Sequence, residues 1–353
     1  MAIVGKKIGQ VRWQSPSNIA LIKYWGKKGF QIPANPSLSI TLSKSFTETI
    51  VNYHPARNSG KPELDFYFEG KPNQAFADKI KNYLDRIKNE LPFIDDLDLV
   101  INSRNTFPHS AGIASSASAM SALALCLCGI DNSLKGLEDA DDEQFFYRAT
   151  HFARIGSGSA SRSVFGNMSS WGKSEFIPGS SNLTASPYTL PMHEIFEGFQ
   201  DSILLVSKGE KKVSSRAGHG LMENNPFAEA RYLQASENLV NIMQSIETGD
   251  VDSFIEIVES EALTLHGMMM ASKPGYMLME PDTVEIIKKI QAFREQSGVK
   301  LCFTLDAGPN VHVLYPKLER KRILEFIKDE LQQHCVDGQW IEDEMGDGPK
   351  RLS

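Results

Sequence analysis

Four short stretches combine residue types that could bind or transform an anionic ligand. The longest is Asn-Thr-Phe-Pro-His-Ser-Ala-Gly-Ile-Ala-Ser-Ser-Ala-Ser, residues 105–118, which leads into an alanine-rich segment. Small residues let a ligand approach the backbone, and the free amides at a helix N-terminus attract phosphate. We therefore predict a phosphate-binding loop here; the alternative is a serine-capped helix after an ordinary turn. The stretch matches neither the Walker A pattern nor Gly-x-Gly-x-x-Gly.

A second stretch of small residues also indicates an anion-binding site. Residues 153–163 read Ala-Arg-Ile-Gly-Ser-Gly-Ser-Ala-Ser-Arg-Ser, so that serines alternate with small residues around Arg162. Serine hydroxyls and amides can face an anion while the guanidinium grips a carboxylate or phosphate with two hydrogen bonds. A flexible linker is the alternative, but apolar Val164 and Phe165 follow closely. We therefore favour an anion site.

The third stretch, residues 17–28, mixes lysines with aromatic residues. In an extended chain Lys23, Trp25 and Lys27 share one face, while Tyr24 and Gly26 share the other. A lysine beside aromatic rings can be partly desolvated and still offer a cation to an anionic ligand. A solvated basic edge strand is the competing interpretation.

The fourth stretch contains a carboxylate at the end of an apolar segment. Asp306 precedes Ala-Gly-Pro-Asn at residues 307–310. A carboxylate at a strand end could orient or deprotonate a substrate hydroxyl, although aspartate is also an ordinary turn residue. The lysine-rich segment 208–212 is followed by Ser215 and Arg216. If this segment lies near such a site, these two residues could contact the ligand; a solvated loop is the alternative.

Composition limits the classes of function. The chain has 353 residues, a net charge of −7 and 41% hydrophobic residues, which argues for a globular protein and against a general nucleic-acid binder. Its first thirty residues nevertheless contain no acidic residue, and this asymmetry favours a cationic pocket for an anionic small molecule. They contain the basic residues Lys6, Lys7, Arg12, Lys23, Lys27 and Lys28.

Cellular context follows from the cysteines and the apolar segments. The four cysteines form no Cys-x-x-Cys pair, so we expect buried, reduced thiols. The N-terminal segment lacks the apolar core of a signal peptide, and the longest apolar stretch, 117–130, looks too short to span a bilayer. We therefore expect a cytoplasmic protein that does not bind membranes.

The candidate stretches are joined by mixed strands and helices without a regular β-α-β rhythm, which favours an α+β fold. The length predicts two domains, placed at residues 1–190 and 191–353 on either side of a turn-rich segment. We expect strands within 10–50, at 97–101, at 203–207, at 299–305 and at 311–315. We expect helices at 73–91, 117–127, 143–154, 227–246, 251–266, 283–294 and 317–333.

Taken in order, these stretches resemble the diphosphomevalonate decarboxylase family of the GHMP kinase superfamily. The matching segments lie at 17–28, 32–43, 105–118, 153–166, 211–218 and 304–310. The resemblance implies a two-domain α+β fold with the active site in the cleft between the domains. The N-terminal domain would be ribosomal protein S5 domain 2-like and the C-terminal domain ferredoxin-like. The implied reaction phosphorylates the 3-hydroxyl of mevalonate 5-diphosphate with ATP, after which phosphate and CO2 leave to give isopentenyl diphosphate.

The resemblance also implies a role for each candidate residue. Asp306 would orient or deprotonate the 3-hydroxyl, Lys23 would lie near the transferring phosphoryl group, and Arg162 would hold the substrate carboxylate. Substrate contacts would come from Asn18, Tyr24, Lys27, Ser157, Ser159, Ser215 and Arg216. The ATP site would comprise Asn105, Pro108, Gly112, Ala114, Ser115 and Ser116. Mg²⁺ would accompany ATP and be held partly by its phosphates, its protein ligands being unknown.

Two positions differ from the family pattern. An arginine common at the start of the helix corresponding to 73–91 is absent from Asn73-Gln74-Ala75, and the family's Asn-Ser-Ser is Asn35-Pro36-Ser37 here. The alternative enzyme is therefore a mevalonate 5-phosphate decarboxylase. A GHMP small-molecule kinase and a nucleotide-binding protein without catalysis are further alternatives. A homodimer is what the family resemblance suggests.

Overall fold

The structure is a computed structural model that describes residues 8–58, 61–108, 113–137, 142–209 and 215–353. Its first layer is a sheet in the order β12-β1-β2-β5-β3-β4, with β6 paired to β2 and β7 paired to β6. All pairs are antiparallel except β3 with β5. The strands are β1 (Gly9–Ile22), β2 (Ser37–Pro55), β3 (Leu64–Phe68), β4 (Lys71–Pro72), β5 (Leu97–Asn105), β6 (Met168–Trp171), β7 (Ala185–Pro187) and β12 (Lys350–Arg351).

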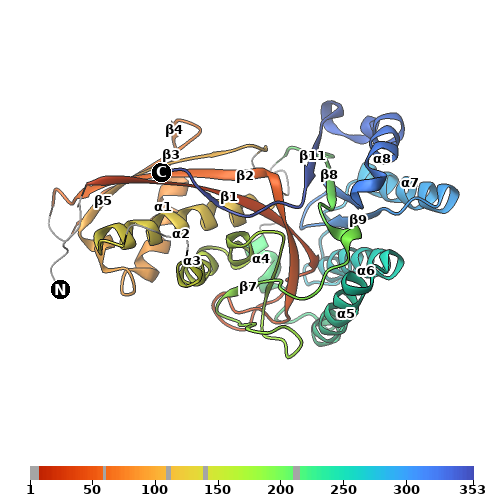
Figure 1. The fold of residues 1–353 in the computed structure, drawn as a ribbon, viewed down its shortest axis with the longest axis horizontal. Helices are drawn as coiled ribbons and strands as arrows, with labels where there is room; N and C mark the ends of the chain where they lie inside the picture. Colours follow the sequence, from red (N-terminus) through yellow and green to blue (C-terminus); the bar gives the residue numbers. More distant parts are fainter. Residues whose placement is uncertain (1–7, 59–60, 109–112, 138–141, 210–214) are drawn as a thin grey trace.

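Three helices cover one face of this sheet (Figure 1). They are α1 (Gln74–Ile87), α2 (Ser115–Leu134) and α3 (Glu143–Gly156), with the short 3-10 helices η1 (Pro92–Asp95) and η2 (Gly158–Val164). The side chain of Asn73 caps α1 by accepting from the Phe76 amide at 3.1 Å. Apolar residues of α1 recur with helical spacing, and this amphipathic stripe is buried against the sheet.

Helix α2 corrects an expectation about the apolar segment. It is longer than the predicted 117–127 and is, by length and composition alone, able to cross a membrane. However, 83% of its apolar window is buried inside the protein, between the sheet and α3. A helix that is apolar on all sides and enclosed by its own protein is a core helix.

The second sheet has the antiparallel order β11-β8-β10-β9. Its strands are β8 (Gln200–Leu204), β9 (Cys302–Leu305), β10 (Val311–Tyr315) and β11 (Trp340–Glu344). The helices of this half are α4 (Ser215–Gly220), α5 (Ala228–Thr248), α6 (Val251–Met270), α7 (Pro281–Ser297) and α8 (Arg320–Phe326). Short helical turns complete it: η3 (Glu194–Phe196), η4 (Lys317–Glu319), η5 (Ile327–Leu331), η6 (Gln332–His334) and η7 (Val336–Gly338).

The two halves share one core. Register shifts between Pro16 and Asn18 and between Ala20 and Ile22 interrupt the pairing of β1 with β2. Such irregularities bend a strand, and the distal ends of both strands run down to α5 and α6 (Figure 1). Apolar side chains of β1 and β2 there pack in one cluster with those of α5, α6 and β8. The end of β1 is therefore held between the halves.

Most predicted helices and strands are present, with bounds that differ by a few residues. The predicted helix 317–333 is wrong as one element, because it divides into η4, α8, a π-helical turn at η5, and η6. The short strands β3, β4, β6, β7, β11 and β12 were not predicted. All four cysteines are buried and unpaired, as expected. The boundary between residues 190 and 191 stays a prediction.

Candidate active site

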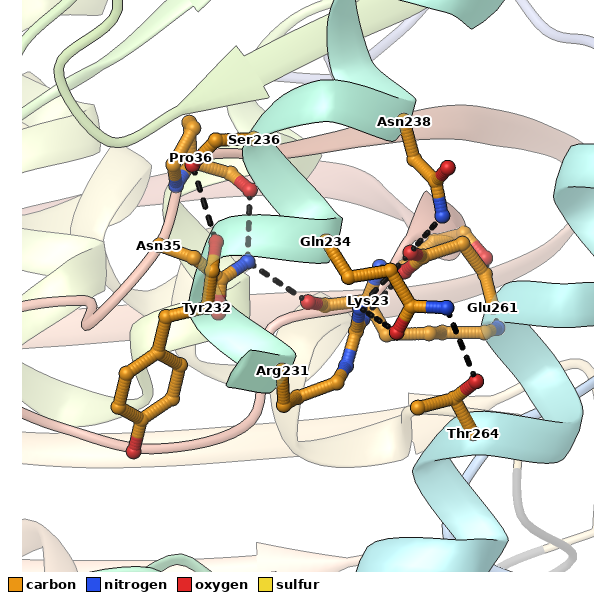
Figure 2. Close-up of polar contacts among 11 residues, drawn as sticks. Lys23, Asn35, Pro36, Arg231, Tyr232, Gln234, Ser236, Asn238, Glu261 and Thr264 are labelled. Carbon is orange, nitrogen blue, oxygen red and sulfur yellow. Dashed lines mark hydrogen bonds and ion pairs between the residues drawn. The ribbon is translucent and has the colours of Figure 1, made fainter. Parts of the chain in front are cut away.

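Lys23 follows the last residue of β1 and is buried, with 1% of its surface exposed. Its main chain is held from both sides: its N–H donates to Glu261 Oε2 at 2.8 Å, and its carbonyl accepts from Asn35 Nδ2 at 3.0 Å (Figure 2). Its Nζ donates to the Ala20 carbonyl at 2.6 Å. The interpretation of this segment as a solvated edge strand is therefore wrong for Lys23.

The charges around Lys23 show which predicted residues lie near it. Burial lowers the pKa of Lys23 from 10.5 to about 8. The negative charges of Asp306 and Glu261 raise this pKa, and the positive charges of Arg162 and Arg231 lower it. The three predicted catalytic residues therefore share one electrostatic environment, although they come from distant parts of the sequence.

Arg162 lies on η2 and is buried, with 3% of its surface exposed. Its Nε donates to Asn18 Oδ1 at 3.4 Å, and its Nη1 donates to Ser37 Oγ. Burial lowers the pKa of Arg162 from 12.5 to about 10, and the charge of Asp306 raises it. No carboxylate among the described residues forms an ion pair with Arg162. A buried guanidinium without a counter-ion is suited to an anionic ligand.

Asp306 follows β9 at the start of the predicted turn. His266 Nε2, on α6, donates to the Asp306 carbonyl at 3.1 Å, and the Gly308 amide donates to it at 2.7 Å. Burial lowers the pKa of His266 to about 4, so the ring is neutral near pH 7 and acts here as a donor. The half-buried Asp306 is thus held through its main chain, and no described residue forms a hydrogen bond or ion pair with its carboxylate.

Tyr24 and Trp25 both turn inward, which corrects the expectation that they lie on opposite faces. The chain leaves β1 at Ile22, so strand alternation no longer applies. The Tyr24 ring packs against Trp171, with centroids 4.7 Å apart, and against His219 on α4, at 4.4 Å. Burial raises the pKa of Tyr24, and its hydroxyl has no hydrogen-bond partner among the described residues. That hydroxyl is a free group for a ligand.

Gly158 explains how η2 comes so near to Tyr24. A Cβ at this position would lie 2.8 Å from Trp171 and 2.9 Å from the Tyr24 hydroxyl. Only glycine therefore permits this approach. The predicted ligand Lys27 is half-buried and pairs with Pro33 in an isolated β-bridge. The pKa of His219 is lowered mainly by burial and, to a smaller extent, by the nearby charge of Lys27.

The two stretches of small residues meet in space. Ser157 Oγ lies 3.3 Å from Ser116 Oγ, at the start of α2, and 3.5 Å from Ser159 Oγ on η2. Asn18 joins the same group, because its Nδ2 donates to the Ser159 carbonyl at 3.2 Å and to Ser163 Oγ at 2.8 Å. The linker interpretation of residues 153–163 is wrong, since they form the end of α3 and then η2.

The start of α2 differs from a serine-capped helix. Its N-cap is Ala114, with a positive φ of 41° and no side-chain capping bond, and its first turn holds Ser115 and Ser116 but no acidic residue. The positive end of a 20-residue helix is thus left for an anion. Asn105 supports the loop by accepting from Thr47 Oγ1 at 2.8 Å.

Some predicted residues cannot be placed in this way. Gly112 lies outside the described residues, and Pro108 is half-buried at the edge of that gap. Ser215 and Arg216 begin α4, but their side chains lie outside the described part of the chain. Within the residues that the structure describes, no three His, Cys, Asp or Glu side chains form a group that could hold a metal ion.

Several residues of this cluster escaped the sequence analysis. Glu261 and Arg231 lie within ordinary helical patterns, so no local signal marks them. Ser37 was noted only because its neighbourhood departs from the family pattern, yet it contacts Arg162. Trp171 and His219, which enclose Tyr24, carry no recognisable motif.

Comparison with known families decides where this arrangement belongs. A family model described as the diphosphomevalonate decarboxylase-like N-terminal domain matches residues 15–183, and one described as the mevalonate 5-diphosphate decarboxylase C-terminal domain matches 202–349. The chain belongs to the diphosphomevalonate decarboxylase family. The diphosphomevalonate decarboxylase of Ganoderma lucidum is 29% identical over 336 residues, which cover 90% of this chain and 81% of the relative.

Solved structures of the family have the same fold. The mevalonate diphosphate decarboxylase of Staphylococcus aureus has a TM-score of 0.82 and 30% identity, covering 98% of both chains. The enzyme from Enterococcus faecalis has a TM-score of 0.81 and 27% identity, covering 98% of this chain and 99% of its own. A further structure, MDDEF in complex with MVAPP, AMPPCP and magnesium, has a TM-score of 0.82 and 29% identity, with 98% and 99% covered. The two-domain α+β GHMP kinase-like fold expected from the sequence is therefore confirmed.

Proposed function

We propose that this protein catalyses the ATP-dependent decarboxylation of mevalonate 5-diphosphate to isopentenyl diphosphate, releasing ADP, phosphate and CO2. The observation that carries the proposal is the cluster of Lys23, Arg162 and Asp306, in which the charge of one half-buried carboxylate acts on two buried cations. Membership of the decarboxylase family, and family structures bound to MVAPP with AMPPCP and magnesium, support the same activity.

The first half of the reaction transfers a phosphoryl group to a tertiary hydroxyl. Asp306 orients that hydroxyl and accepts its proton as the new O–P bond forms. The Lys23 ammonium offsets the negative charge on the transferring group, and its burial strengthens this interaction relative to water. With its main chain held on both sides and its Nζ held by the Ala20 carbonyl, the cation needs little reorganisation.

The second half breaks a C–C bond. Phosphorylation turns a poor leaving group into a good one, and its departure creates positive charge beside the substrate carboxylate. The electron pair of the C–C bond then fills that centre as CO2 leaves. Arg162 holds the carboxylate in a fixed orientation relative to the leaving group. Its hydrogen bonds to Asn18 and Ser37 fix the plane of the guanidinium.

Two adjacent groups of residues are assigned to the phosphate-bearing ends of the two ligands. The N-terminus of α2, with Ser115 and Ser116, fits the ATP phosphates because its first turn holds no acidic residue and no described side chain caps it. Tyr24, Lys27, Ser157 and Ser159, with Ser215 and Arg216 on α4, are assigned to the substrate diphosphate. Mg²⁺ bound to ATP would neutralise its phosphates. A cytoplasmic location, a homodimer, and the lack of nucleic-acid and membrane partners stay predictions.

The deciding experiment is a coupled assay of ADP and CO2 release with mevalonate, its 5-phosphate and its 5-diphosphate, each with ATP and Mg²⁺. We expect equal amounts of ADP and CO2 with the diphosphate only. Activity confined to the monophosphate would favour the alternative decarboxylase, for which the arginine-free start of α1, capped by Asn73, is the supporting observation. ADP without CO2 would indicate a kinase, and nucleotide binding without turnover would contradict the proposal.

A further inference from the structure

A buried ion pair contacts the main chain of the catalytic lysine. Glu261 on α6 and Arg231 on α5 are paired, and their side chains are 0% and 1% exposed. Arg231 Nη1 donates to Glu261 Oε1 at 2.8 Å, and Asn238 Nδ2 donates to the same oxygen at 2.7 Å (Figure 2). The proposed reaction assigns no role to any of these three residues.

Stability alone is a weak reason for such a pair. When two charges are buried, the free energy of hydration that they lose is about as large as the gain from their mutual attraction. Well-packed apolar residues in their place therefore often give the same stability. The pair lies on α5 and α6, which also contribute apolar side chains to the core shared by the two halves. A buried carboxylate at this place therefore calls for another explanation.

The contact made by the second carboxylate oxygen of Glu261 supplies this explanation. Glu261 Oε2 accepts the main-chain N–H of Lys23 at 2.8 Å, a contact between residues 238 positions apart in the sequence. Asn35 holds the Lys23 carbonyl on the opposite side at 3.0 Å. Figure 2 shows Glu261 between Arg231, Asn238 and the chain at Lys23. The carboxylate thus joins α6 in the second half to the end of β1 in the first.

We propose that Glu261, held by Arg231 and Asn238, is a positioning residue for Lys23. It fixes the main chain from which the lysine projects, and its negative charge, added to that of Asp306, helps to keep this buried amine cationic in the free enzyme. The inference rests on the proposed function for its catalytic meaning, but its physical content concerns Lys23 alone.

The charges that face Lys23 agree with this role. Burial lowers the pKa of Lys23 to about 8, so a modest loss of negative charge would leave the amine largely neutral near pH 7.5. Two charges raise the pKa of Lys23, those of Asp306 after β9 and Glu261 on α6. Two lower it, those of Arg162 on η2 and Arg231 on α5. Two further groups sense the Lys23 charge, Asp201 on β8 and His266 on α6. Of the carboxylates that raise the pKa of Lys23, Glu261 also binds its main chain.

The test is Glu261→Gln, which preserves shape and an oxygen that can accept the Lys23 N–H but removes the charge. The pKa of Lys23 is measured directly by NMR on protein with ¹³Cε-labelled lysine, its signal assigned by its loss in Lys23→Met. We expect the pKa of Lys23 to fall by about one pH unit in Glu261→Gln. The alkaline limb of kcat/KM should move to lower pH by the same amount.

A matched control separates this role from folding. Glu259, two residues earlier on α6, forms a two-bond pair with Arg294 at 2.6 and 3.1 Å and is absent from the charges that act on Lys23. Glu259→Gln should lower the melting temperature without moving the Lys23 pKa or the alkaline limb.

Glu261→Gln leaves Arg231 buried without its counter-ion and could unfold the protein. The double variant Glu261→Gln/Arg231→Met removes both charges and avoids that cost. Because the Glu261 charge acts on Lys23 more strongly than the Arg231 charge, the double variant should still lower the Lys23 pKa, by less than the single one.

An unchanged Lys23 pKa in whichever of these variants folds overturns the inference, even if activity falls. Conversely, a wild-type protein that releases no CO2 from any of the three substrates would contradict the proposed function, while the NMR titration would still decide the role of Glu261.

Discussion

Replacing Arg162 with lysine tests the proposed carboxylate clamp most directly. Arg162 is 3% exposed and donates to both Asn18 and Ser37, so its guanidinium is held in one plane. A lysine keeps the charge but offers a compact ammonium in place of the planar fork. At least one charged hydrogen bond is lost, which costs about 1.5–3 kcal/mol. At a factor of ten for each 1.4 kcal/mol, kcat/KM should fall roughly 10- to 150-fold.

The variant should also acquire a new pH dependence. Burial lowers the pKa of Arg162 from 12.5 to about 10, which leaves the guanidinium charged at any working pH. An amine starts about two pH units lower, so the same burial would bring its pKa near that of Lys23, about 8. The introduced amine should therefore lose its charge as the pH rises through about 8. The deficit in kcat/KM should widen above that pH.

The assay is the coupled measurement of ADP and CO2 with mevalonate 5-diphosphate, run between about pH 6.5 and 9. Arg154→Lys is the matched control, because Arg154 is equally buried but binds the main-chain carbonyls of Leu183 and Gln31 at 2.8 and 3.1 Å. That variant should lower the melting temperature and leave kcat/KM within about threefold. A rate for Arg162→Lys within about threefold of wild type at all pH values would refute the clamp.

Three further predictions follow from the same geometry. Asp306→Ala should lower kcat roughly 100- to 10,000-fold, because general base and positioning are lost, while calorimetry still detects nucleotide binding. In the wild type, kcat/KM should fall as the pH rises through about 8, because the pKa of Lys23 is lowered to that value and its ammonium is lost above it; a pH profile measures this. Gly158→Ala should cost about 1–3 kcal/mol of unfolding free energy and raise KM, since the added Cβ meets Trp171 and the Tyr24 hydroxyl; denaturant titration and kinetics measure both.

Each of these has an outcome that contradicts it. A near-normal kcat in Asp306→Ala removes Asp306 from the mechanism. An activity that stays constant from about pH 7 to 10 means that the Lys23 charge is not required. Gly267→Ala is the control for the glycine variant, because nothing lies within 4 Å of the added Cβ on α6. Equal stability of the two glycine variants would refute the close approach of η2 to Tyr24.

Local patterns predicted those parts of the fold that depend on neighbours in the sequence. The amphipathic spacing in α1, and the strands β9 and β10 around the turn after Asp306, could be predicted because each follows a periodicity or turn signal. The short strands β6, β7 and β12 could not, because strands of two to four residues carry no period of their own. They are strands because a longer strand presents free backbone groups beside them.

By itself, the sequence determined which residues can do chemistry: the lysine among aromatics, the two stretches of small residues, and the aspartate before a turn. Residue types and short spacings suffice for this, because they set charge, reach and backbone freedom. Only the tertiary structure decided that Lys23 is buried, that Ser157 meets Ser116, and that Glu261 holds Lys23 across 238 positions. Burial and long-range contacts depend on how the bent end of β1 packs between two halves, and no local pattern encodes that packing.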